Sequence, residues 1–293
     1  MAPPSSPGRA SAIYDVEETP CPLCGAGERE STPYAHPPFR VVRCLNCRLW
    51  YLSPRLTAAA TDRLYADDGY FGGGEFGYTD YAAQERTLRT TFRGLLNRIR
   101  DRGVAAGALL EVGCGPGLLL DEARAFHHRR SGVEHSAAAR DDAARRSGAT
   151  MYASVAQAAA NAPYDIIIAT HVVEHVLHPV AFVREITALL RVGGHLVLAA
   201  PDMASPWRRV MGRRWPSFRY PEHVSFFDAA TLRRLMIAAG LERPESLAYP
   251  HEFPAGLIVQ RLGLPFLPGF ARLAVTLPAT TVCLMGQRPP ARP

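Results

Sequence analysis

The chain has 293 residues, of which 47% are hydrophobic and 20% are charged. This composition is typical of globular proteins and excludes a fibrous or disordered chain. The formal net charge is +6, and every basic residue is an arginine, because the sequence contains no lysine. A Schiff-base lysine and a phosphate-binding P-loop are therefore excluded, since both need a lysine amine. We attribute the basic charge to a GC-rich genome rather than to nucleic-acid binding.

The sequence has no apolar segment long enough to cross a membrane. No run of about twenty apolar residues occurs, so we expect no spanning helix. Residues 1–9 are rich in proline and serine and lack the apolar core of a signal peptide, which favours a cytoplasmic protein. We expect residues 1–18 to form a disordered tail. In a reducing compartment the six cysteines are expected to be ligands or core residues rather than disulfides.

Two cysteine pairs dominate residues 19–58. They are Cys21 with Cys24 and Cys44 with Cys47, and 19 residues separate the pairs. Four thiolates in two such pairs suit a tetrahedral zinc ion, and four protein ligands leave no open position for catalysis. We therefore predict a structural zinc ribbon over residues 19–58. The alternative is four free cysteines in a small core.

The rest of the chain alternates between helical and strand patterns. Residues 59–102 read as a helical linker or cap that a glycine run at 72–74 interrupts. From residue 103 to 293 we expect strands at 109–112, 132–134, 150–153, 164–170 and 195–200, with weaker ones at 245–249 and 280–286. Helices are expected at 117–129, 136–146, 179–191 and 229–239. This rhythm predicts an α/β fold, a doubly wound, mostly parallel, seven-stranded Rossmann-like sheet with helices on both faces.

A glycine loop follows the first of these strands. Glu111 ends the strand, and Gly113, Gly115 and Gly117 lie between it and the next helix. The dinucleotide pattern G-x-G-x-x-G would need glycine at Leu118, which disfavours NAD and FAD. The sequence LLEVGCGPG instead resembles the first motif of class I S-adenosylmethionine (SAM)-dependent methyltransferases. A tight strand-helix turn without any ligand is the other interpretation.

The resemblance implies SAM as cofactor and a set of contacts for it. The loop would wrap the methionine and ribose, Glu111 would face the amino end, and Glu134 would accept both ribose hydroxyls. Ser154 and Val155 fall where the family contacts adenine. The full set expected from the resemblance is Glu111, Gly113, Cys114, Gly115, Gly117, Glu134, His135, Ser154, Val155 and His171.

A second motif follows the fourth strand. His171, Glu174 and His175 there, and Glu222 and His223 further on, are similar to the small-molecule branch of the same family. The cysteine pairs resemble the amino-terminal module of some sugar C-methyltransferases of natural-product pathways. The resemblance implies a sugar, a nucleotide-linked sugar or another secondary metabolite as substrate.

The histidines are the candidates for acid-base chemistry. In open α/β sheets, ligands bind beyond the carboxyl ends of the strands, where His171, Glu174 and His175 are expected. A methyl group on a sulfonium is already activated, so the enzyme has to align the acceptor and take its proton, for which a histidine is suited. We predict His175 or His171 as the base, with Glu174 and His223 as further candidates. A structural role in orienting the loop is the alternative.

A segment rich in arginine and aromatic residues, 207–220, occupies the family's usual position for a substrate lid. Guanidinium groups there are able to bind a phosphate or carboxylate, and aromatic rings to stack on a substrate ring. A solvated basic loop is the alternative. The candidate substrate contacts are Tyr70, Phe71, Tyr81, Arg214, Trp215 and Tyr220.

The leading hypothesis is thus a SAM-dependent methyltransferase with a small-molecule partner rather than nucleic acid. An RNA methyltransferase that uses the zinc ribbon to hold nucleic acid is one alternative, and a non-catalytic SAM-binding module is another. The sequence leaves open whether oxygen, nitrogen or carbon accepts the methyl group, and it leaves the oligomeric state open.

Overall fold

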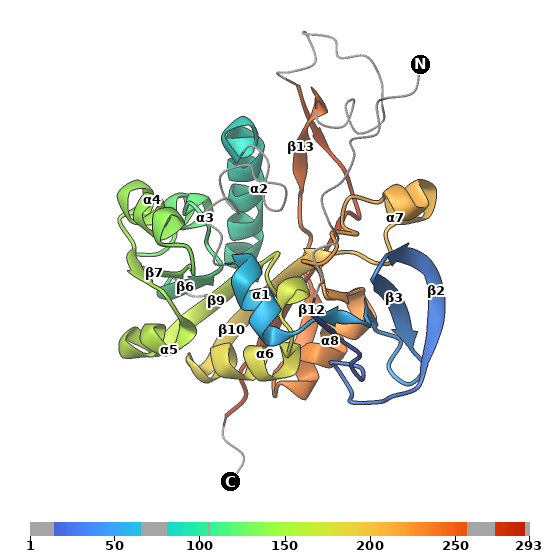
Figure 1. The fold of residues 1–293 in the computed structure, drawn as a ribbon. Helices are drawn as coiled ribbons and strands as arrows, with labels where there is room; N and C mark the ends of the chain where they lie inside the picture. The colour runs from blue at the N-terminus through green and yellow to red at the C-terminus, as the bar shows by residue number, and fades with distance from the viewer. Residues whose placement is uncertain (1–14, 66–80, 105, 257–272, 291–293) are drawn as a thin grey trace.

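A seven-stranded sheet forms the centre of the protein (Figure 1) and confirms the predicted fold class. The computed structural model describes residues 15–65, 81–104, 106–256 and 273–290. The strand order is β12-β15-β10-β9-β6-β7-β8. Strands β10, β9, β6, β7 and β8 are parallel, whereas β15 runs antiparallel to both β10 and β12. The strands are β6 (Ala108–Val112), β7 (Arg129–Val133), β8 (Thr150–Tyr152), β9 (Tyr164–Thr170), β10 (Leu190–Pro201), β12 (Glu242–Ser246) and β15 (Thr281–Gln287).

Helices cover both faces of the sheet because alternate side chains of each buried strand point to opposite sides. In β9, Ile166 and Ile168 pack into one hydrophobic core, and Ile167 and Ala169 pack into the other. The first core includes residues of α2 (Tyr81–Asp101), α3 (Leu118–Glu122) and α4 (Ala137–Ser147). The second includes residues of α5 (Val155–Ala158), α6 (Pro179–Ala188) and α8 (Ala229–Ala238).

Two helix ends differ from the sequence prediction by more than one residue. The helix expected over 117–129 ends at Glu122, followed by the 3-10 turn Ala123–Ala125, because the chain must turn back to pair Arg129 with Ala108. The helix expected to reach Arg191 ends at Ala188, because Leu190 already pairs with Tyr164 of β9. In both places strand pairing overrides helix propensity.

The N-terminal module forms a second sheet of order β11-β4-β3-β2. Its strands β2 (Arg29–His36), β3 (Phe39–Cys44) and β4 (Trp50–Leu52) are antiparallel, and β11 (Ser225–Phe226) joins β4 from the distant loop after β10. Strand β1 (Val16–Glu17), which we expected within the tail, pairs with β5 (Arg55–Leu56), so these two residues are not disordered. In Figure 1 this blue module lies on the side of the molecule opposite α4.

Several shorter elements complete the described chain. These are α1 (Ala58–Tyr65), α7 (Pro206–Met211), the paired strands β13 (Glu252–Pro254) and β14 (Ala274–Thr276), and the 3-10 turns Ala159–Asn161, Val173–His175 and Gly212–Arg214. No helix within the described ranges is long and apolar enough to span a membrane.

Gly117 offers a test of the packing between α3 and α4. Its φ is +78°, and a Cβ added there would lie 2.8 Å from Cα of Ala143. Gly148 has a similar φ of +66° but no atom within 4 Å of an added Cβ. We expect Gly117→Ala to lower the free energy of unfolding by about 2–5 kcal/mol, from left-handed strain and overpacking together. Gly148→Ala should cost only the strain, about 1–2 kcal/mol.

Urea denaturation of both variants measures these losses. Equal losses for the two variants would show that the contact with Ala143 contributes nothing.

Candidate active site

A cavity of about 1390 Å³ lies at the carboxyl ends of β6, β7 and β9. The glycine loop lines one part of it, and the residues after β9 line another. Further walls come from the loop between β10 and β11 and from β13. The cavity therefore lies where ligands bind in open α/β sheets.

The glycine loop is held by Glu134 at the end of β7. One carboxylate oxygen of Glu134 accepts a hydrogen bond from the Gly115 N–H at 2.9 Å, and the other accepts from the Ser136 N–H at 3.0 Å. Gly113 has a φ of +73°, and an added Cβ would lie 2.4 Å from Cγ2 of Val172. The loop needs glycine there for both conformation and space.

Glu111 is a buried carboxyl group on the cavity wall. The side chain belongs to a residue that is only 2% exposed, and its Oε2 has no hydrogen-bond partner among the residues that the structure describes. Burial raises the pKa of Glu111 well above its ordinary value, and the negative charge of Glu134 raises it further. A buried acid with an unpartnered oxygen beside a cavity is suited to a ligand that carries a cation or a hydrogen-bond donor.

The other residues predicted to bind the cofactor lie around the same cavity. Cys114 is buried, its thiol is 3.7 Å from the Gly115 carbonyl oxygen, and burial raises its pKa. His135, Ser154 and Val155 also line the cavity. Ser154 has a second role, because its hydroxyl accepts a hydrogen bond from the Gln157 N–H and caps α5.

His171 and Glu174 form a pair after β9. Nδ1 of His171 lies 3.3 Å from Oε1 of Glu174, and Nε2 of His171 has no hydrogen-bond partner in the described part of the chain. His171 has a φ of +56°, a left-handed conformation that is uncommon for a residue other than glycine. Burial opposes ionisation of Glu174, but His171, His175 and His223 lower its pKa to about 2.

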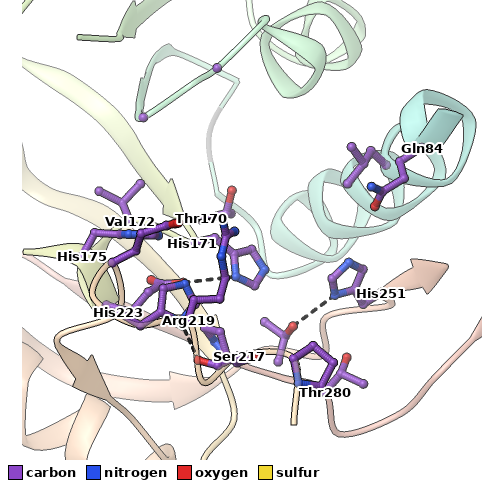
Figure 2. A pocket seen from close by; sticks show the side chains of 18 of the residues that line it. Gln84, Thr170, His171, Val172, His175, Ser217, Arg219, His223, His251 and Thr280 are labelled. Carbon is purple, nitrogen blue, oxygen red and sulfur yellow. Dashed lines mark hydrogen bonds and ion pairs between the residues drawn. The ribbon is translucent and has the colours of Figure 1, made fainter. Parts of the chain in front are cut away.

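His175 and His223 adjoin this pair (Figure 2). Their ring centroids are 4.6 Å apart, and the rings are nearly perpendicular, at 89°. Nδ1 of His223 lies 2.8 Å from the Ser217 carbonyl oxygen, which requires Nδ1 to carry the proton. Burial lowers the pKa of both histidines, so both rings are neutral at pH 7.

The predicted substrate residues fall into three groups. Trp215 and Tyr220 line the cavity, whereas Arg214 is exposed and is not part of its lining. Tyr70 and Phe71, and the side chain of Tyr81, lie outside the described residues.

Sequence reasoning missed the residues from the C-terminal part that close the cavity. His251 stacks on Phe253 with 4.0 Å between ring centroids, and its ring centroid lies 5.8 Å from that of His171. Its Nδ1 is 3.2 Å from the hydroxyl oxygen of Thr281, and burial lowers its pKa to about 3. Figure 2 shows His251 across the cavity from His175 and His223. No local motif marks this residue, because only the sheet order brings it here.

The four cysteines of the N-terminal module converge. The Sγ atoms of Cys21 and Cys47 are 3.4 Å apart, those of Cys24 and Cys44 are 3.6 Å apart, and all four lie within 4.8 Å of one another. Zinc–sulfur bonds of about 2.3 Å in a tetrahedron place sulfur atoms about 3.8 Å apart. The cluster therefore fits a zinc ion.

The module is bonded to the cavity wall. The Leu52 N–H donates to the Val224 carbonyl at 2.9 Å, and the Val224 N–H donates to the Glu174 carbonyl at 2.8 Å. Arg55 also donates to the Leu177 carbonyl at 2.7 Å. The cysteine module thus supports the segments that carry Glu174 and His223.

Comparisons with known proteins agree with this arrangement. A family model described as a methyltransferase domain matches residues 83–245, more than half of the chain. No curated protein sequence matches the chain.

Solved structures share the fold at low sequence identity. The 1,6-didemethyltoxoflavin-N1-methyltransferase of Burkholderia thailandensis is 16% identical, with a TM-score of 0.54 over 90% of this chain and 100% of that chain. The magnesium protoporphyrin IX methyltransferase of Synechocystis PCC 6803 is 14% identical, with a TM-score of 0.50 over 78% of this chain and 99% of that chain. The fold is that of the class I SAM-dependent methyltransferases, and the chain belongs to the methyltransferase-domain family.

Proposed function

We propose that this protein transfers a methyl group from SAM to a small molecule, such as a sugar, a nucleotide-linked sugar or another secondary metabolite. The observation that carries the proposal is a single cavity with acids at a glycine loop and an imidazole nitrogen, Nε2 of His171, without a partner among the described residues. The cavity, about 1390 Å³, exceeds the roughly 300–1,000 Å³ of a typical ligand pocket. It has room for a cofactor and a small acceptor together.

The glycine loop forms the cofactor end in this proposal. Glu134, fixed by two backbone N–H groups, keeps further lone pairs for the ribose hydroxyls. Glu111 meets the amino end of the cofactor, where a positive charge stabilises the ionised carboxylate. When bound, SAM supplies a methyl group that its sulfonium already activates.

His171 is the best-placed base among the four candidates. Glu174 lies at Nδ1 and favours the tautomer that carries the proton there, which leaves a lone pair on Nε2 to take a proton from the acceptor. The same logic underlies carboxylate-imidazole pairs in other enzymes. Backbone strain of the kind that His171 shows often occurs at functional sites.

The acceptor end has aromatic walls. Trp215 and Tyr220 line the cavity, and aromatic side chains suit contact with a sugar or a planar substrate. Arg219 and Tyr249 line it as well, and we add them to the candidate substrate contacts.

The cysteine module, residues 19–58, has a structural role in this proposal. A zinc ion bound by the four thiolates would stabilise strands β3 and β4, and β4 pairs with β11, which begins two residues after His223. The metal would then act on catalysis through the position of these residues.

The first prediction from the proposed function concerns Glu111 and pH. Ionisation of Glu111 on cofactor binding would release a proton, so affinity for S-adenosylhomocysteine (SAH) should increase as pH rises from acidic values through the raised pKa of Glu111. Calorimetric titration in buffers of different ionisation enthalpy measures the released proton. Glu111→Gln should bind SAH more weakly and without this proton release. Proton release that persists in Glu111→Gln would contradict the assignment.

The second prediction tests the base and the proposed activity. A panel of candidate acceptors, screened for the release of SAH, should yield a substrate. On that substrate, turnover by His171→Ala should be about 10²–10⁴-fold lower than turnover by the wild type. Binding of SAH should change only a few fold, as calorimetry measures. His178→Ala is the matched control, because His178 is exposed, lies in the same segment and is not part of the cavity lining. Turnover near wild type in His171→Ala would exclude His171 as the base.

The third prediction concerns zinc. Cys44→Ala should reduce bound zinc from one ion per chain to none, because three thiolates bind zinc far more weakly than four. Turnover should fall more than SAH affinity, since the module contacts the acceptor side of the cavity. Cys283→Ala removes a buried cysteine outside the cluster and should retain its zinc by mass spectrometry. Loss of SAH binding equal to loss of turnover would argue against a local role for the module.

A further inference from the structure

A second group of metal-binding side chains lies in the cavity itself. Ligand atoms of Glu174, His175 and His223 all lie within 4.8 Å of one another. We propose that these three residues bind one divalent transition-metal ion, distinct from the ion in the cysteine cluster. Two imidazole nitrogens and one carboxylate are a donor set found for iron, zinc and cobalt.

The fold brings the three ligands together from two segments. Glu174 and His175 lie in the 3-10 turn after β9, and His223 lies before β11. The hydrogen bond from the Val224 N–H to the Glu174 carbonyl, at 2.8 Å, ties the two segments. Metal bonds of about 2.0–2.2 Å require ligand separations of roughly 3.0–3.5 Å, which are compatible with the 4.8 Å limit that the structure sets.

The carboxylate of Glu174 is the strongest indication of a bound cation. Its side chain is 1% exposed, and within the described residues neither of its oxygens accepts a hydrogen bond. His171 Nδ1, at 3.3 Å from Oε1, is the ion-pair contact that the structure gives it. A buried carboxylate oxygen without a hydrogen bond is costly, and a divalent cation at Oε2 would offset that cost.

The surroundings of His223 resemble the outer shell of a metal site. Metal-bound histidines usually donate their other ring N–H to a carbonyl or carboxylate, which fixes the tautomer. Nδ1 of His223 makes such a contact with the Ser217 carbonyl, at 2.8 Å, and directs the Nε2 lone pair elsewhere.

Arg219 opposes a cation at this position. Its charge is near both histidines, but its guanidinium pairs with the carboxylate of Glu222 at 2.8 Å. This ion pair offsets the repulsion.

The metal would select an acceptor with a hydroxyl group, an inference that rests on the proposed function. Three protein ligands leave positions open toward the cavity that all three residues line. A hydroxyl bound there would ionise more readily, and Nε2 of His171 would take its proton. The oxygen then forms its bond to the methyl carbon as the sulfur–carbon bond breaks, and SAH leaves.

Cobalt titration of protein that carries one zinc ion per chain tests the site. We expect native mass spectrometry to show one Co²⁺ per chain beyond the zinc. Its absorption should lack the thiolate charge-transfer bands of cobalt bound to cysteines. Glu174→Gln and His223→Ala should each weaken Co²⁺ binding by at least about 100-fold, more than loss of an outer-shell partner usually costs. His178→Ala, an exposed histidine outside the cluster, should bind Co²⁺ as the wild type does.

Affinity for SAH, measured on the same preparations, checks that the variants are folded. Absence of a second metal in the wild type, or its retention in both variants, would overturn the proposed site. A protein that binds SAH but no second metal would leave the methyltransferase proposal intact. A protein that binds the second metal but not SAH would support the metal site and refute the proposed function.

Discussion

The cavity wall that carries Glu174 and His223 depends on one backbone segment that is hydrogen bonded on both sides. Val224 accepts from Leu52 of the cysteine module and donates to the Glu174 carbonyl, at 2.9 and 2.8 Å. Strand β11, which follows, pairs with β4 of the module. The module therefore contacts the segment that holds His223 and Glu174 together, and in the proposed function a zinc ion would stabilise a module this small.

The three buried acids of the cavity differ in what compensates them. Glu134 accepts hydrogen bonds from two backbone N–H groups, and Glu174 has imidazoles around it. Glu111 has a raised pKa because burial outweighs its hydrogen bonding. Glu134, whose two oxygens both accept hydrogen bonds, serves to hold the loop, whereas the unbonded oxygens of Glu111 and Glu174 have binding capacity left for a ligand.

Sequence patterns predicted the parts of the fold and site that depend on neighbouring residues. Strand β9 was predicted at its observed bounds, because a continuous apolar run between turn signals has few other interpretations. The glycine loop and the cysteine pairs are likewise local motifs. His251 and the end of α6 at Ala188 were not predicted, because they depend on strand pairing. His251 approaches His171 only because β15 lies beside β10, which no local pattern shows.

The distribution of charge in the cavity suits the proposed transfer. Methyl transfer removes the positive charge of the sulfonium, so an acid placed against the sulfur would stabilise the reactant and raise the barrier. In the proposed complex the acids Glu111 and Glu134 meet the amino and ribose groups, whose charges do not change during the reaction. The side chains assigned to the acceptor end include neutral histidines, with Glu174 already paired to His171. Binding energy from the amino and ribose groups of the cofactor thus positions the methyl group without stabilising the positive charge of the sulfonium.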